Sequence, residues 1–175
     1  MGDTDAMANG SSVVVVGGGV MGCSIAFHLA ERGVDTLVLE RGTVCSGMTA
    51  RSGALVRMHY TNEPEARLAH ASLPYFSNWG EMVGRGDCGF LKTGMARIVS
   101  AENEQKLRAN VDMLERVGIN TRVIGASELA EVAPYWHVDD VAAAAWEPDS
   151  GCADPVGTTH GLLDRARELG AEVRL

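Results

Sequence analysis

Three glycines have the spacing needed to bind a dinucleotide through the backbone. Gly17, Gly19 and Gly22 form a Gly-x-Gly-x-x-Gly motif that follows an apolar run and opens a segment with helical periodicity. The first glycine permits a tight turn, the second lets a pyrophosphate approach the backbone, and the third allows close packing of helix on strand. The N–H groups at the start of the helix would then face the diphosphate.

A carboxylate follows where such a motif needs one. Glu40 ends the next apolar run, about 20 residues after the glycines, and can accept hydrogen bonds from ribose hydroxyls. Its charge disfavours a nucleotide with a 2′-phosphate, although the adjacent Arg41 weakens this argument. The alternative is a glycine-rich turn in an ordinary α/β protein. We favour the dinucleotide because strand, glycines, helix, second strand and terminal acid occur in the expected order.

The elements around the glycines form one βαβ unit. Residues 12–16 include four consecutive valines and predict a short strand buried on both faces. The spacing of apolar residues predicts a helix over residues 20–32, with Gly33 after its end and a second strand at residues 34–39. Residues 12–40 therefore match the span of one βαβ unit in a parallel sheet.

The rest of the chain predicts a long loop followed by mixed helices and strands. Residues 41–60 are rich in Gly, Ser, Thr and Arg, with strand-like content only at residues 55–56. A helix is expected from Asn62 toward Trp79, with a kink or break near Pro74. We expect further helices at residues 102–117, from a Ser127 cap, and from the Asp154 cap to Gly170, and strands within residues 89–99, 119–123, 141–146 and 171–175.

Composition excludes several classes of function. The net charge of −8 argues against a nucleic-acid partner, because phosphate binding needs a basic surface. No apolar run reaches the roughly 18 residues of a membrane span. The four cysteines lack zinc-ligand spacing, so we expect neither a metal site nor a disulfide framework. Residues 1–11 predict a flexible leader without the features of a signal peptide, and a cytoplasmic location follows.

The order of these motifs resembles a known family. Residues 13–41 resemble the N-terminal FAD-binding segment of flavin-dependent amine and amino-acid oxidoreductases, the group of D-amino-acid oxidase, glycine oxidase, sarcosine oxidase and dimethylglycine dehydrogenase. Residues 45–63 resemble the loop that runs past the flavin in sarcosine-oxidase-type members. Residues 90–107 and 144–173 resemble a strand, helix and return helix of the same group, so the resemblance covers nearly the whole chain after residue 12.

The resemblance implies an α/β, Rossmann-like FAD/NAD(P)-binding fold with part of an α+β substrate domain. Residues 12–60 would belong to the FAD-binding domain, residues 61–150 to the substrate domain, and residues 151–175 to a return into the FAD-binding domain. Members of the group are about twice as long as this chain. We therefore expect an incomplete chain that ends inside a domain.

The resemblance also implies the site residues. FAD would contact Gly17, Gly18, Gly19, Val20, Met21 and Gly22 at the diphosphate, Glu40 and Arg41 at the adenosine ribose, and Ser46, Thr49, Arg51, Ser52 and Gly53 in the loop around the diphosphate and flavin edge. In dimethylglycine-dehydrogenase-like members a histidine of this loop is bonded to the flavin. Arg51 stands at that position here, so the FAD is expected to be non-covalent at this loop.

Arg57 matches a position that binds the substrate carboxylate in sarcosine-oxidase-like members. A planar guanidinium with two donors suits a carboxylate, whereas a solvated or ion-paired surface arginine is the alternative. Other polar and aromatic residues are expected to be structural: His59 packed or hydrogen-bonded, Cys45 inert, and Trp79, Trp136 and Trp146 in the core or at a domain interface.

By resemblance, the reaction is oxidation of the C–N bond of a small amine or N-methyl amino acid. A hydride equivalent would pass to the flavin, and water would hydrolyse the imine. Two alternatives stay open. An NAD-dependent Rossmann dehydrogenase would continue with regular βαβ units after Glu40, where a polar loop stands instead. A non-catalytic or truncated flavin-binding subunit is suggested by the abrupt end at Leu175.

Overall fold

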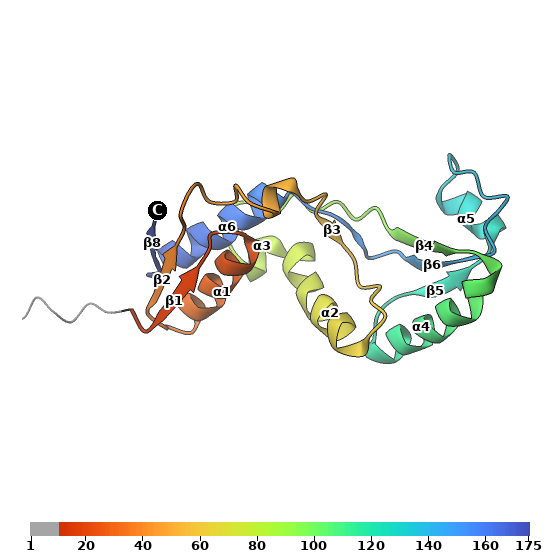
Figure 1. Ribbon diagram of the computed structural model, residues 1–175, viewed down its shortest axis with the longest axis horizontal. Coiled ribbons are helices and arrows are strands. Elements are labelled where there is room, and N and C mark those ends of the chain that lie inside the picture. The colour runs from red at the N-terminus through yellow and green to blue at the C-terminus, as the bar shows by residue number, and fades with distance from the viewer. Residues whose placement is uncertain (1–10) are drawn as a thin grey trace, which may run out of the picture. The chain divides into compact units, whose positions relative to one another are not determined.

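The computed structural model describes residues 11–175, which form two compact units (Figure 1). The first contains the described residues up to Ala54, together with Asn78–Gly89 and Asp154–Leu175. The second contains Leu55–Ser77 and Phe90–Ala153. All but the last residue of the expected leader lies outside the described residues.

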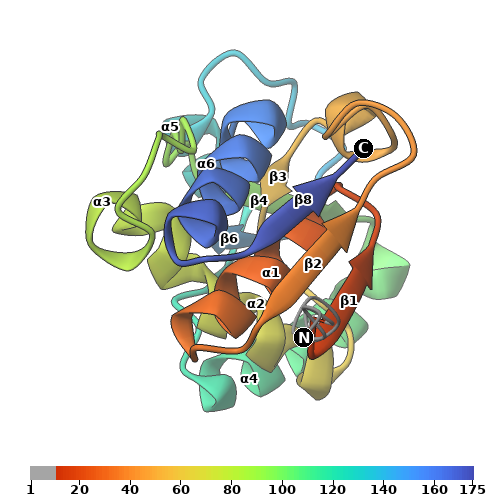
Figure 2. The same cartoon turned by 90° about the vertical axis from the view of Figure 1, so that its left-hand side faces the viewer.

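A parallel three-stranded sheet is the centre of the first unit. Its strands are β1 (Val13–Val16), β2 (Thr36–Leu39) and β8 (Glu172–Arg174), and they lie in the order β1-β2-β8 (Figure 2). The helices of this unit are α1 (Val20–Glu31), α3 (Trp79–Met82), α6 (Pro155–Glu168) and the short 3₁₀ helix η1 (Thr49–Arg51). The expected strand–turn–helix–strand order of residues 12–40 is confirmed, and Gly33 after α1 is left-handed with φ of +70°.

Alternate residues of the sheet face the core. Val15 and Val38 are buried, as are the α1 residues Cys23 and Phe27, and α1 packs against α6. The opposite side of β1 is open, since Val16 is 83% exposed. The expectation that this strand is buried on both faces is therefore wrong for the described residues. Four β-branched residues favour an extended strand, but burial also needs a layer on each face.

The second unit is built on antiparallel strands. One sheet has the order β4-β6-β5, formed by β4 (Met95–Val99), β6 (Ala143–Glu147) and β5 (Arg122–Ile124). A two-stranded sheet pairs β3 (Leu55–Val56) with β7 (Gly151–Cys152). The helices are α2 (Glu63–Ser77), α4 (Glu104–Val117), α5 (Ala126–Val132) and the 3₁₀ helix η2 (Ala101–Asn103).

Small side chains on β6 allow helices to cover both faces of the larger sheet. Ala143 and Ala145 pack with Leu107 and Val111 of α4. Ala144, on the other face, packs with Leu129 of α5. The sheet therefore has a hydrophobic core on each of its faces.

Two expected helix boundaries differ from the structure. Helix α2 continues through Pro74 to Ser77 without a break, and its residues Ala66 and Leu73 pack in a cluster with Leu114 of α4. This packing outweighs the hydrogen bond that proline cannot make. The N-cap of α5 is Gly125 and not the expected Ser127. No helix within residues 11–175 combines the length and apolar character that crossing a membrane requires.

We expect Gly161→Ala to destabilise the first unit. An added Cβ would lie 2.7 Å from Cζ2 of Trp79 and 2.9 Å from the Arg85 carbonyl oxygen, so α6 or the buried indole must shift. Such overpacking costs about 1–3 kcal/mol and would appear as a lower Tm in thermal unfolding of the complete protein.

Gly80→Ala is the matched control. Gly80 also lies in a helix, but no atom stands within 4 Å of its added Cβ, so the Tm should stay unchanged or rise slightly. Equal Tm values for the two variants would contradict the close approach of α6 to Trp79.

Candidate functional site

The turn after β1 has the backbone geometry that only glycine allows. Gly17 adopts a φ of +109°, and no atom lies within 4 Å of the position that its Cβ would occupy. A Cβ on Gly22 would lie 1.9 Å from the Gly17 carbonyl oxygen. Glycine is therefore required at residue 17 for its positive φ, and at residue 22 for the close contact between α1 and the end of β1.

Glu40 joins the end of β2 to this turn. Its Oε2 accepts a hydrogen bond from the Gly18 N–H at 2.7 Å, and its Oε1 accepts one from the Gly42 N–H at 2.9 Å. These two backbone N–H groups, Gly18 first, lower the pKa of the carboxyl from its ordinary value. Glu40 is therefore ionised at neutral pH, and each oxygen keeps a lone pair for a further donor such as a hydroxyl.

The loop after Glu40 returns to the same turn. The Thr49 Oγ1 accepts a hydrogen bond from the Val20 N–H at 3.1 Å, and the Cys45 N–H donates to the Gly18 carbonyl oxygen at 2.9 Å. Helix α1 has no capping side chain at Gly19, so Thr49 satisfies one of the N–H groups that a helix start leaves unpaired. Thr49 is therefore in direct contact with the turn. The Ser46 N–H instead donates to the Thr43 carbonyl oxygen within the loop.

The remaining residues expected around the cofactor are exposed. Met21 is 73% exposed at the start of α1, and Arg41, Arg51 and Gly53 are exposed as well. The Ser52 Oγ accepts a hydrogen bond from the Ala54 N–H within its own loop. The structure therefore brings Glu40, Thr49 and the glycines together. The side chains of Met21, Arg41, Arg51 and Ser52 are left exposed to solvent.

The buried cysteines near the turn are unsuited to nucleophilic chemistry. Burial, followed by the neighbouring Cys45, raises the pKa of Cys23 to about 12. Cys45 is buried against α6, where its Sγ lies 3.6 Å from the Thr159 Oγ1. Within residues 11–175, His, Cys, Asp and Glu side chains form no group that could hold a metal ion.

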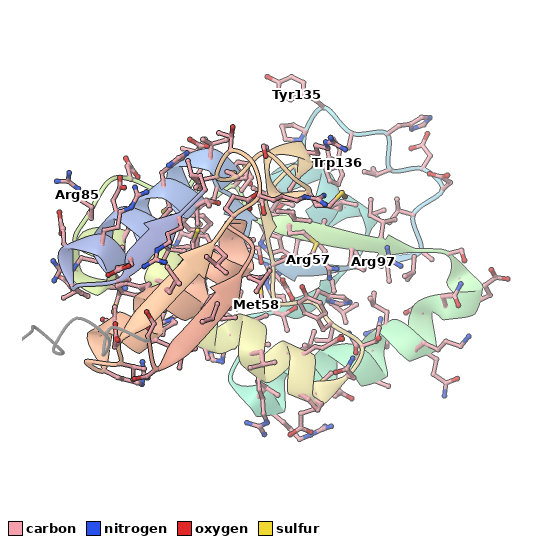
Figure 3. The ribbon with its side chains drawn as sticks, turned by 60° about the vertical axis from the view of Figure 1, so that its left-hand side comes forward. Arg57, Met58, Arg85, Arg97, Tyr135 and Trp136 are labelled. Carbon is pink, nitrogen blue, oxygen red and sulfur yellow. The ribbon has the colours of Figure 1, made fainter. Side chains whose placement is uncertain are left out.

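Arg57 lies in the second unit and lines a cavity of about 510 Å³. Its Nη1 donates to the His59 carbonyl oxygen, and its guanidinium carbon stands 4.5 Å from the centre of the Tyr60 ring. Figure 3 shows Arg57 together with Arg97 of β4, which lines the same cavity. The other lining residues are Leu55, His59, Tyr60, Thr61, Met95 and Ala96.

A buried carboxylate holds the segment that carries Arg57. Glu147 is fully buried, and its Oε2 accepts hydrogen bonds from the Met58 N–H at 3.1 Å and the Ser150 hydroxyl at 2.8 Å. Its Oε1 lies 3.6 Å from the His59 Nδ1, while the His59 Nε2 lies 3.1 Å from the Asn110 Nδ2. His59 is thus packed and hydrogen-bonded, as expected, and Arg57 is anchored through its own neighbours.

Glu147 and Arg97 were not expected at a site. Glu147 ends an alanine-rich stretch and precedes a proline, a pattern that is typical of the start of an exposed turn. The alternation of strand β6 was the available signal, because Glu147 lies on the same face as the buried Ala143 and Ala145. Trp136, which was expected in the core or at a domain interface, is not a core residue, because it is 51% exposed.

Comparisons with known proteins identify the family. The profile of a family described as "FAD dependent oxidoreductase" (DAO) matches residues 12–175. The chain is 31% identical, over 92% of its length, to 4-methylaminobutanoate oxidase (formaldehyde-forming) of Paenarthrobacter nicotinovorans, and 30% identical, over 98% of its length, to mitochondrial sarcosine dehydrogenase of Mus musculus. The matches cover 20% and 19% of those relatives, so the chain spans about a fifth of their length.

A comparison with a solved structure identifies the fold. L-proline dehydrogenase from P. horikoshii superposes with a TM-score of 0.86 at 31% identity, covering 93% of this chain and 43% of that one. The fold is thus α/β and Rossmann-like, as expected, and the comparisons give no support to an NAD-dependent dehydrogenase. The chain belongs to the family of FAD-dependent oxidoreductases.

Proposed function

We propose that the complete protein oxidises the C–N bond of a small amine or N-methyl amino acid with FAD as cofactor. The observation that carries the proposal is the pairing of the Gly17–Gly22 turn with an ionised Glu40, in a chain whose relatives include an N-methylamine oxidase and sarcosine dehydrogenase. Bound FAD would supply the acceptor for the electrons of the oxidised C–N bond.

The first unit has the features that FAD needs. The backbone at Gly17 is open, and α1 begins at Val20 after the N-cap Gly19, which has no side chain to cap the helix, so the positive end of α1 can face a diphosphate. Glu40 would accept hydrogen bonds from the adenosine ribose, and Arg41 would lie near the same end. Ser46, Thr49, Arg51, Ser52 and Gly53 would line the loop toward the flavin edge, with no covalent bond at Arg51.

Glu40→Gln should weaken FAD binding about tenfold or more. The amide places an NH₂ group against one of the two backbone N–H donors and removes the charge that attracts hydroxyl donors. The dissociation constant can be measured by quenching of flavin fluorescence as the apo form of the complete protein is titrated with FAD.

Glu31→Gln is the control, because it removes the same charge from the exposed end of α1. It should bind FAD as the wild type does. An unchanged affinity in Glu40→Gln would show that Glu40 is not a ribose ligand.

Arg57 would orient the substrate by its carboxylate. Its guanidinium is fixed by the His59 carbonyl and by the Tyr60 ring, and Glu147 holds the intervening Met58 N–H. A guanidinium held in this way presents a preformed fork, so little side-chain freedom is lost when a carboxylate binds. The reacting C–N bond would then be held at a set distance from that carboxylate.

Arg57→Lys should raise the substrate concentration needed for half-maximal flavin reduction about 10- to 100-fold. Lysine keeps the charge but loses the fork that matches a carboxylate. Anaerobic stopped-flow reduction of the complete holoprotein measures this without knowledge of the electron acceptor. Reduction by an amine that lacks a carboxylate is the control, and an equal effect on both substrates would contradict carboxylate binding by Arg57.

A non-catalytic flavin-binding subunit is the second candidate. It predicts tight FAD binding without reduction of the flavin by any amine. No disulfide joins the four cysteines of residues 11–175, and we propose a reducing compartment such as the cytoplasm for either candidate.

A further inference from the structure

We propose that the site takes amino acids with a second carboxylate, and that Arg97 binds this second group. The proposal rests on the proposed function, in which Arg57 binds the first carboxylate. Arg97 then determines which substrate side chains are preferred.

Two adjoining cavities of the second unit carry positive charge only. The cavity at Arg57, of about 510 Å³, and its neighbour, of about 400 Å³, share the lining residues His59, Thr61 and Arg97. The ionised side chains that line them are Arg57, Arg97 and Lys106, and no carboxylate is among the lining residues. This is unexpected in a chain with 23 acidic and 15 basic residues. The local excess of cations favours an anionic ligand.

The position of Arg97 explains why it forms no ion pair with the residues that the structure describes. Arg97 of β4 pairs with Ala145 of β6, and the acid nearest on that face, Glu147, lies opposite Met95. The Glu147 carboxylate is buried and bonded to the Met58 N–H and the Ser150 hydroxyl. No ion pair joins Arg97 or Arg57 to a carboxylate within residues 11–175.

Three other exposed arginines of this unit have carboxylate partners, whereas no ion pair within residues 11–175 involves the exposed Arg116 of α4. Arg67 and Arg108 meet Glu63 and Glu104 one turn earlier on their helices, and Arg122 of β5 meets Glu128. Arg97 differs from Arg116 in its location, because Arg97 lines both cavities, which also carry Arg57 and Lys106, whereas Arg116 lines neither. A ligand carboxylate would give Arg97 the partner that its own strand and sheet do not supply.

A ligand with two carboxylates fits both arginines. Arg57 would hold the carboxylate next to the reacting amine, and Arg97 would hold a carboxylate at the end of the side chain. A substrate with an apolar side chain would leave Arg97 solvated and lose this interaction. We therefore expect N-methylglutamate to be preferred over N-methylnorvaline, which has the same number of side-chain carbons but a methyl group in place of the second carboxylate.

The direct test compares binding of glutarate and pentanoate to the complete holoprotein by calorimetry. These acids have equal length and differ in the second carboxylate. Glutarate should bind about 10- to 100-fold more tightly, and Arg97→Gln should abolish the difference while leaving pentanoate binding within about twofold. Arg97→Lys should retain part of the difference in affinity between glutarate and pentanoate. Arg122→Gln is the matched control, since this arginine lies in the same sheet and pairs with Glu128 of α5.

Flavin reduction separates failure of this inference from failure of the proposed function. If glutarate binding depends on Arg97 but neither N-methyl amino acid reduces the flavin, the dianion site stands and amine oxidation is wrong. If N-methylnorvaline and N-methylglutamate reduce the flavin with equal kcat/KM, or if Arg97→Gln leaves glutarate binding unchanged, the second-carboxylate site is overturned.

Discussion

The hydrogen bonds of one carboxylate connect the two strands on which the cofactor site depends. Glu40, at the end of β2, accepts from the N–H of Gly18 in the turn after β1 and from the N–H of Gly42 at the start of the next loop. The turn can approach Glu40 because Gly17 is left-handed and Gly22 has no side chain to strike the Gly17 carbonyl. Since these groups are aligned before any ligand arrives, the ordering cost of binding is small.

A second carboxylate has the corresponding role in the other unit, but it is buried. Glu147 binds the Met58 N–H, and the residues on either side of Met58 are Arg57 and His59. The hydrogen bonds that the buried Glu147 Oε2 accepts from the Met58 N–H and the Ser150 hydroxyl tie this segment to the end of β6. The cations at the cavity, Arg57, Arg97 and Lys106, form no ion pair with a carboxylate within residues 11–175. An acidic chain can in this way present a locally positive site.

Features decided by short stretches of sequence were predictable, and features decided by distant contacts were not. Gly33 after α1 and the Asp154 cap of α6, which accepts from the Val156 N–H, follow from local backbone chemistry. Pro74 lies within an unbroken helix because tertiary packing outweighs the local preference. The exposure of Val16 depends on which layers cover β1, and no local pattern states this. The alternation of β6 places Glu147 on the face of Ala143 and Ala145, but that this face is buried depends on its packing against the distant helix α4.

The most direct measurement is a crystal structure of the complete protein with FAD. The account predicts that the adenosine ribose hydroxyls lie within hydrogen-bond distance of the Glu40 carboxylate, with the diphosphate against the backbone of residues 17–22. A dinucleotide bound with its ribose away from Glu40, or with its diphosphate away from the glycine turn, would contradict the account.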